Sequence, residues 1–79
     1  MQIFIKTLIQ GRILTLDLNH NTTIEELKNK LFDIEGIPVK LQKLYYGHII
    51  LNNHRSLSDY NIMKETTLEI RIYPFNKNI

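Results

Sequence analysis

Apolar and polar residues alternate along three stretches of the chain, at residues 1–8, 13–18 and 66–73. This period of two is typical of a β-strand with one face buried and the other face toward water. A short turn containing Gly11 joins the first two stretches and predicts a β-hairpin. The side chains expected on the buried faces are Met1, Ile3, Ile5, Leu14, Leu16, Leu18, Leu68, Ile70 and Ile72.

A different period follows the hairpin and predicts one α-helix. Thr23 can cap its first turn, and Glu26, three residues later, can reach back to complete a capping box. Gly36 suits the left-handed residue at the end of a helix, and Pro38 prevents the helix from resuming. Helical spacing places Ile24, Leu27 and Leu31 toward the hairpin and points Glu25, Lys28 and Asp33 to water.

The remaining residues predict short elements. Residues 41–46 and 48–51 are strand candidates separated by Gly47, whereas residues 56–62 are too polar for a strand and indicate a tight loop or a single helical turn. One helix among mostly antiparallel strands indicates an α+β domain, with the helix on one face of a single sheet. The connections allow the first and last strands to pair at the centre of that sheet.

Composition narrows the function classes. The 79 residues suffice for one domain. The net charge of +2 is small and is spread along the chain, which argues against nucleic-acid binding. The chain has no cysteine, which excludes disulfides and a thiol nucleophile, and no apolar run long enough to cross a membrane. Without a secretory signal, we expect an intracellular protein. Its small charged surface favours a monomer.

Catalytic chemistry finds no support in the residue pattern. His20, His48 and His54 fall in predicted turns without a metal-ligand spacing, and the serines lack a glycine elbow and a clear base. Helix capping and the helix dipole explain the paired glutamates at the start of the helix. We therefore expect no enzyme activity, no metal and no cofactor.

Several quoted stretches resemble the ubiquitin family in order and spacing. These are "MQIF-KTL" at the start, "TIE-LK-K" in the helix, "D-EGIP" after it, and "LSDYNI-KE-TL" from Leu57 to Leu68. The resemblance implies the β-grasp fold, a mixed β-sheet packed on a single α-helix, over residues 1–74, followed by a short tail at 75–79. It also implies that the Tyr60 hydroxyl braces its loop through a backbone group.

The same resemblance defines candidate sites. The partner-binding surface of the family corresponds here to Leu8, Tyr45, Gly47, Ile50, Glu69 and Arg71. Glu69 and Arg71 place charges where family partners bury aliphatic surface, and desolvating an unpaired charge is costly, so we predict weak binding to the usual receptors. The sequence leaves open whether the two charges pair across the surface with Lys6 or Tyr45. Secondary apolar patches would combine Phe4 with Ile13, and Ile37 with Ile72 and Pro74. The possible lysine acceptors are Lys6, Lys28, Lys30 and Lys64.

Conjugating members of the family end in Arg-Gly-Gly, whereas this sequence reads "YPFNKNI" after Ile72 and has no adjacent glycines. We therefore expect a non-conjugatable interaction module that binds or mimics components of the ubiquitin–proteasome system: ubiquitin-binding domains, ligases and proteasome receptors. The alternatives are a covalent modifier, the N-terminal ubiquitin-like domain of a longer protein, and a diverged idle copy or viral decoy. The expected location is the cytoplasm or nucleus, and the Ile, Asn and Lys content fits an AT-rich genome of a protist or virus.

Overall fold

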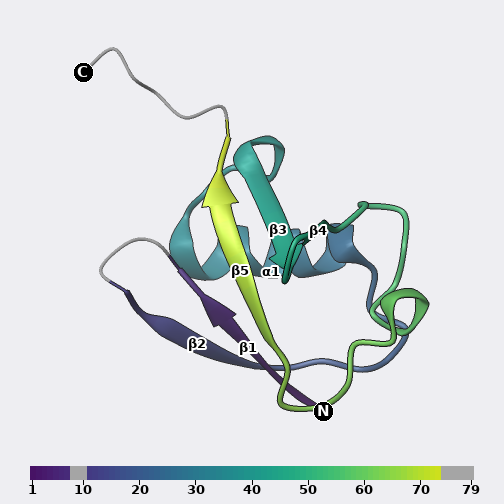
Figure 1. Ribbon diagram of the computed structural model, residues 1–79. Coiled ribbons are helices and arrows are strands. Elements are labelled where there is room, and N and C mark those ends of the chain that lie inside the picture. The colour runs from purple at the N-terminus through teal and green to yellow at the C-terminus, as the bar shows by residue number, and fades with distance from the viewer. Residues whose placement is uncertain (8–10, 74–79) are drawn as a thin grey trace.

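Five strands form one mixed sheet, and a single α-helix lies against one face of it (Figure 1). The computed structural model describes residues 1–7 and 11–73. The strands are β1 (Gln2–Lys6), β2 (Ile13–Asp17), β3 (Gln42–Tyr46), β4 (Ile49–Ile50) and β5 (Thr67–Ile72), and the helix is α1 (Ile24–Glu35). Their order across the sheet is β2-β1-β5-β3-β4. This is the β-grasp arrangement, so the predicted α+β class and ubiquitin-like fold are confirmed.

The first and last strands lie side by side at the centre of the sheet, an order that the connections in the sequence allow. β1 pairs with β2 as an antiparallel hairpin, whereas β1 and β5 run parallel with Ile5 beside Leu68. Because both of these side chains are fully buried, the central strand pair is also the middle of the core. Alternation along β5 then leaves Glu69 and Arg71 on the face of the sheet that points away from the helix.

Helix α1 begins and ends where the capping signals place it. The Glu26 backbone N–H donates to Thr23 Oγ1 at 3.1 Å, and the Thr23 N–H donates to Glu26 Oε1 at 2.8 Å, which completes the capping box. Gly36 ends the helix with a φ of 77°, and its N–H donates to the Phe32 carbonyl. Satisfying these terminal backbone groups fixes the helix bounds independently of packing.

A polar residue closes the core at the far end of the helix. Gln42 is 2% exposed, and its side-chain nitrogen donates to the carbonyls of Lys28 and Ile37 at 2.9 Å each. It follows the 3-10 helix η1 (Val39–Leu41), which the sequence did not predict because three residues are too few to show a period. Gln42 thus ties the first residue of β3 to the segment that leaves α1.

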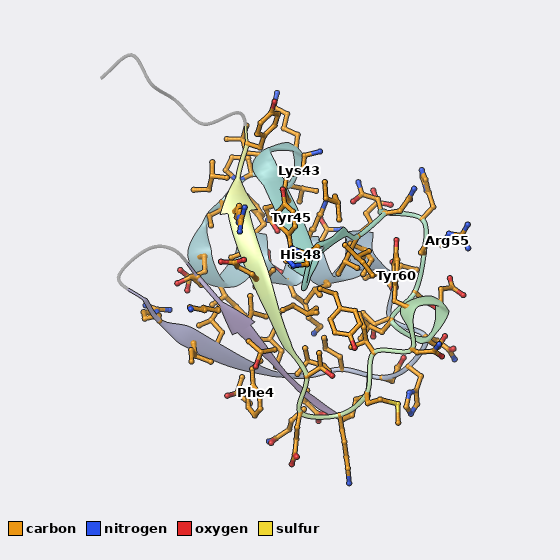
Figure 2. All side chains as sticks on the ribbon, viewed as in Figure 1. Phe4, Lys43, Tyr45, His48, Arg55 and Tyr60 are labelled. Atoms are coloured by element: carbon orange, nitrogen blue, oxygen red, sulfur yellow. The ribbon has the colours of Figure 1, made fainter. Side chains whose placement is uncertain are left out.

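The loop over residues 56–62 contains the single helical turn that its polar pattern indicated, the 3-10 helix η2 (Ser58–Tyr60). Leu57 and Ile62 anchor the loop in the core. The Tyr60 hydroxyl accepts a hydrogen bond from the Asn52 backbone N–H at 2.7 Å, so the bracing role implied by the family resemblance is confirmed. Figure 2 shows Tyr60 lying between this loop and the segment that follows β4.

Candidate functional site

A row of side chains crosses the outer face of the sheet, the face opposite α1. The strand registers place Ile50 beside Tyr45, Tyr45 beside Glu69, Glu69 beside Lys6, and Lys6 beside Ile13. Directly paired residues project to the same side of a sheet, so the row runs across all five strands. We call these five residues the outer row. It brings Tyr45, Glu69 and Ile50 of the predicted binding surface together.

Three side chains of this face contact one another. The guanidinium carbon of Arg71 lies 4.6 Å from the centroid of the Tyr45 ring. An Arg71 Nη2 nitrogen donates to Glu69 Oε1 at 3.1 Å. The pairing of these two charges, which the sequence left open, is therefore between Glu69 and Arg71 on the same strand, and Arg71 also reaches across to the Tyr45 ring. We call Tyr45, Arg71 and Glu69 the charged stack.

The contacts of the charged stack are each modest, but they share one guanidinium. A cation over an exposed aromatic ring contributes about 0.5–1 kcal/mol, and an exposed ion pair contributes about 0–1 kcal/mol. Arg71 is about half exposed and Glu69 less so, at 51% and 29%. The stack therefore orders the side chains on the surface and leaves them accessible to a partner.

Apolar area lies beside the stack on the β3–β4 hairpin. Ile50, which pairs with Tyr45, is 53% exposed on the outer face, whereas Ile49 pairs with Tyr46 and projects to the other side of the hairpin. Gly47 forms the turn between the two strands with a φ of 61°, a conformation that glycine adopts without strain. Leu8, the remaining residue of the predicted binding surface, lies outside the described residues. Figure 2 shows Tyr45 and His48 near this hairpin and Phe4 well away from them.

The two residues of the first secondary patch, Phe4 and Ile13, are diagonal neighbours on the β1–β2 hairpin and not a directly paired couple. Phe4 lies between Thr15 on β2 and Thr67 on β5, whereas Ile13 pairs with Lys6 one step further along the hairpin. Phe4 is half-buried and Ile13 is 61% exposed. The two side chains share the outer face of the sheet but do not occupy paired positions.

The second secondary patch does not form as predicted, because Ile37 is buried. Ile37 is only 7% exposed and belongs to the core, because the chain turns inward after Gly36 to lay it under the sheet. Ile72 is 38% exposed at the end of β5, and Pro74 lies outside the described residues. Ile37 therefore cannot contribute apolar surface to a partner.

Lys28 also departs from expectation. It does not point to water: it is 6% exposed, and its ammonium donates to Asn53 Oδ1 at 2.6 Å. Helical periodicity misses this burial because the covering residues belong to the segment after β4, which packs beside the first turns of α1. Of the four candidate acceptor lysines, Lys28 is therefore buried. The side chains of the other three are exposed: Lys6, Lys30 and Lys64.

Burial also alters the charge equilibrium of Lys28. Desolvation lowers the pKa of its ammonium, and repulsion from Lys43 lowers it further, while Glu25 acts in the opposite direction. Within the described part of the chain, no ion pair joins Lys28 to a carboxylate. The residue is therefore a buried cation with a neutral hydrogen-bond partner.

The histidines lie in turns, as predicted, at His20, His48 and His54. Across residues 1–7 and 11–73, no three histidine or acidic side chains are grouped so that they could hold a metal ion. No helix in the same ranges is long and apolar enough to cross a membrane. The most developed arrangement of side chains in the described chain is the exposed surface composed of the outer row and the charged stack.

In the described residues, a single mixed sheet packed on one helix defines the class of small β-grasp domains. The sequence matches the family model described as "Ubiquitin family" over residues 3–74. The chain belongs to the ubiquitin family. Because this is not a family of enzymes, membership agrees with the absence of a catalytic pattern in the sequence.

The chain is similar to domains of larger proteins. It is 32% identical over 77 residues to ubiquitin-like protein 4A of Rattus norvegicus, which covers 98% of this chain and 48% of that protein. It is 32% identical over 65 residues to the UV excision repair protein rhp23 of Schizosaccharomyces pombe, covering 82% of this chain and 18% of that protein. The chain thus spans about half the length of ubiquitin-like protein 4A, and less of the yeast relative.

Proposed function

We propose that the chain is a ubiquitin-like interaction module that binds components of the ubiquitin–proteasome system without being conjugated to them. The observation that carries this proposal is the charged stack, which shares Tyr45 and Glu69 with the outer row and lies beside the exposed Ile50. A compact surface of aromatic, arginine and aliphatic side chains has the composition that is enriched at the centre of protein interfaces. Partners of this kind would place the protein in the cytoplasm or nucleus.

The stack also indicates which partners fit. Desolvating an ion pair costs less free energy than desolvating a lone charge. A partner that offers only aliphatic side chains would still remove water from the polar groups of the stack without replacing their hydrogen bonds. A suitable partner therefore combines apolar contact over Ile50 with a polar group that can meet Arg71 or Glu69. Receptors that bury only aliphatic surface should bind weakly.

The direct test is a titration of the ¹⁵N-labelled chain with a purified proteasomal ubiquitin-receptor domain and, separately, with a ubiquitin-interacting helix peptide. Amide shifts should change most at residues 43–50 and 69–71. Tyr45→Ala and Arg71→Ala should weaken binding about tenfold or more, as expected when a central aromatic or arginine contact is lost. Phe32→Ala is the matched control, because Phe32 is 47% exposed on the helix, on the opposite side of the domain.

Shift changes confined to another face, or equal affinities for Arg71→Ala and Phe32→Ala, would contradict the assignment of this surface. If the receptor domain and the helix peptide both fail to bind, the ubiquitin-system partners are wrong. In either case the folded state of each variant is checked by its own amide spectrum.

The non-covalent character of the module has a separate test. The three glycines of the sequence all serve internal turns or the helix end, each with a positive φ: Gly11, Gly36 and Gly47. Incubation with ubiquitin-activating enzyme and ATP should therefore give no thioester adduct, with ubiquitin itself as the positive control. A reducible adduct at the expected mass would favour the covalent-modifier alternative instead.

The lengths of the relatives support a second candidate, a ubiquitin-like domain within a longer protein. Ubiquitin-like protein 4A and rhp23 both extend well beyond the region that matches this chain. A denaturing immunoblot from source cells, with intact mass analysis, separates the possibilities. One band near 9.4 kDa supports the free module, one larger discrete band supports a domain of a longer protein, and a ladder supports conjugation.

A further inference from the structure

A polar groove of about 430 Å³ lies beside the proposed binding face. Helix α1 contributes Lys28, β3 contributes Lys43, and the segment after β4 contributes Asn52, Asn53 and His54. Among the described residues that line it, none carries a carboxylate, so its charged groups are cationic or, for the histidine, able to become so. The groove is therefore a place where negative charge is favoured.

Lys28 is the charge most in need of a partner. Its side chain is more than nine-tenths buried, and its hydrogen bond goes to the neutral amide oxygen of Asn53. An ammonium group has three N–H donors, so two remain for other acceptors. A buried cation without a paired carboxylate is costly: desolvation and repulsion from Lys43 lower the pKa of this lysine, and the nearby Glu25 opposes them without forming an ion pair.

The wall of the groove opposite Lys28 is held in place before any ligand arrives. The Glu25 backbone N–H donates to the Asn53 carbonyl at 3.2 Å, which ties this segment to the start of α1. The Asn52 N–H donates to the Tyr60 hydroxyl, and the His54 N–H donates to Asn52 Oδ1 at 2.8 Å. A ligand would thus meet a wall whose backbone is already ordered, which reduces the entropy lost on binding.

We propose that this groove receives a carboxylate side chain from an acidic segment of a partner protein, which pairs with the Lys28 ammonium beside Asn53. The inference rests on the proposed binding function, because the groove adjoins that surface: Ile50 both lines the groove and belongs to the outer row. A partner seated on the charged stack can therefore extend an acidic residue into the groove. The carboxylate supplies the negative charge that Asn53 lacks, and the positive charge of Lys43 also attracts it.

The probe is a synthetic six-residue peptide of alternating Glu and Asp with blocked ends, titrated into the ¹⁵N-labelled chain. The control peptide has Gln and Asn at the same positions. We expect saturable shift changes at the amides of Asn52, Asn53 and His54 with the acidic peptide and none with the neutral one. Lys28→Met should weaken binding at least tenfold, whereas Lys30→Met, the same change at an exposed lysine of the same helix, should change it less than twofold.

Because Lys28→Met leaves Asn53 without its donor and can disturb folding, Asn53→Asp is the second variant. It places a carboxylate of the chain itself against Lys28, so it should keep the fold and also lose peptide binding at least tenfold. Equal peptide affinities for the wild type, Asn53→Asp and Lys30→Met would overturn the proposal, since binding would then reflect net charge alone. Inorganic phosphate that shifts the same amides as strongly as the peptide would also overturn it, in favour of a free-anion site.

The two proposals fail in distinguishable ways. Asn53→Asp leaves the charged stack intact, so it should retain binding to any partner that docks through Tyr45 and Arg71 alone. If receptor domains do not bind but the acidic peptide still does, the docking face is wrong and the groove chemistry stands. If receptor domains bind and the peptide does not, only the groove proposal fails.

Discussion

Replacing Asn53 by aspartate changes one buried contact from neutral to ionic. Lys28 Nζ lies 2.6 Å from Asn53 Oδ1, and the aspartate oxygen can occupy the same position because the two side chains have the same shape. Asn53 is half-buried, so the new carboxylate keeps part of its hydration. Asn53→Asp therefore adds a counter-ion to Lys28 at little cost in desolvation.

The expected gain follows from the strength of the hydrogen bond. A neutral hydrogen bond contributes about 0.5–1.5 kcal/mol, and one between charged groups about 1.5–3 kcal/mol. Repulsion between the new carboxylate and Glu25 reduces that difference. We expect the free energy of unfolding to rise by about 1 kcal/mol, which for a domain of this size raises Tm by roughly 4–8 °C.

The pH dependence has a defined sign. In the wild type the folded pKa of Lys28 lies below its unfolded value, so its destabilising effect is full below the folded pKa and is relieved as pH rises through it. The new aspartate should instead have a folded pKa below its unfolded value. Its contribution is present above the unfolded pKa of about 3.9 and is lost as pH falls through the folded pKa.

Chemical denaturation at pH 7 and at pH 3, with wild type and variant in parallel, measures both effects. The stabilisation should be present at pH 7 and reduced at pH 3. Asn21→Asp is the control, because it makes the same exchange at an exposed residue in the turn before α1. It should change the free energy of unfolding by less than about 0.5 kcal/mol. An Asn53→Asp variant no more stable than the wild type at pH 7 would refute the idea that Lys28 is a buried cation in need of a counter-ion.

Further variants test the remaining assignments by thermal or chemical denaturation. Tyr60→Phe removes the acceptor of the exposed Asn52 N–H and should cost about 0.5–1.5 kcal/mol; an unchanged free energy of unfolding would mean that water replaces the hydroxyl. Thr23→Ala removes the cap of α1 and should cost about 1 kcal/mol, and an unchanged midpoint would contradict the capping box. Ile37→Ala should cost about 2–5 kcal/mol as a core truncation, whereas Ile13→Ala should change stability by less than about 0.5 kcal/mol; similar values for the two would contradict the burial of Ile37.

The sequence predicted those features that depend on neighbours along the chain. The capping pair Thr23 and Glu26 and the alternation around Leu68 each involve residues a few positions apart, so local chemistry determines them. Burial of Ile37 and Lys28 could not be predicted in this way, because distant segments cover them. A lysine on a predicted helix is expected to face solvent unless the covering loop is known. The asparagine that accepts the hydrogen bond of Lys28 is 25 residues away along the chain.

The proposed binding face depends on the same core that determines the fold. Leu68 and Ile70 are buried against the helix, so alternation leaves Glu69 and Arg71 on the outer face, and the pairing of Tyr45 with Glu69 sets which ring the guanidinium can reach. A one-residue slip of β5 would bury both charges and expose both apolar residues, which the core excludes energetically. The charged stack is therefore a consequence of register as well as of residue identity. The sequence placed Tyr45 and Arg71 in the candidate surface through the family resemblance, but their mutual contact depends on the pairing of β3 with β5 and so on the folded sheet.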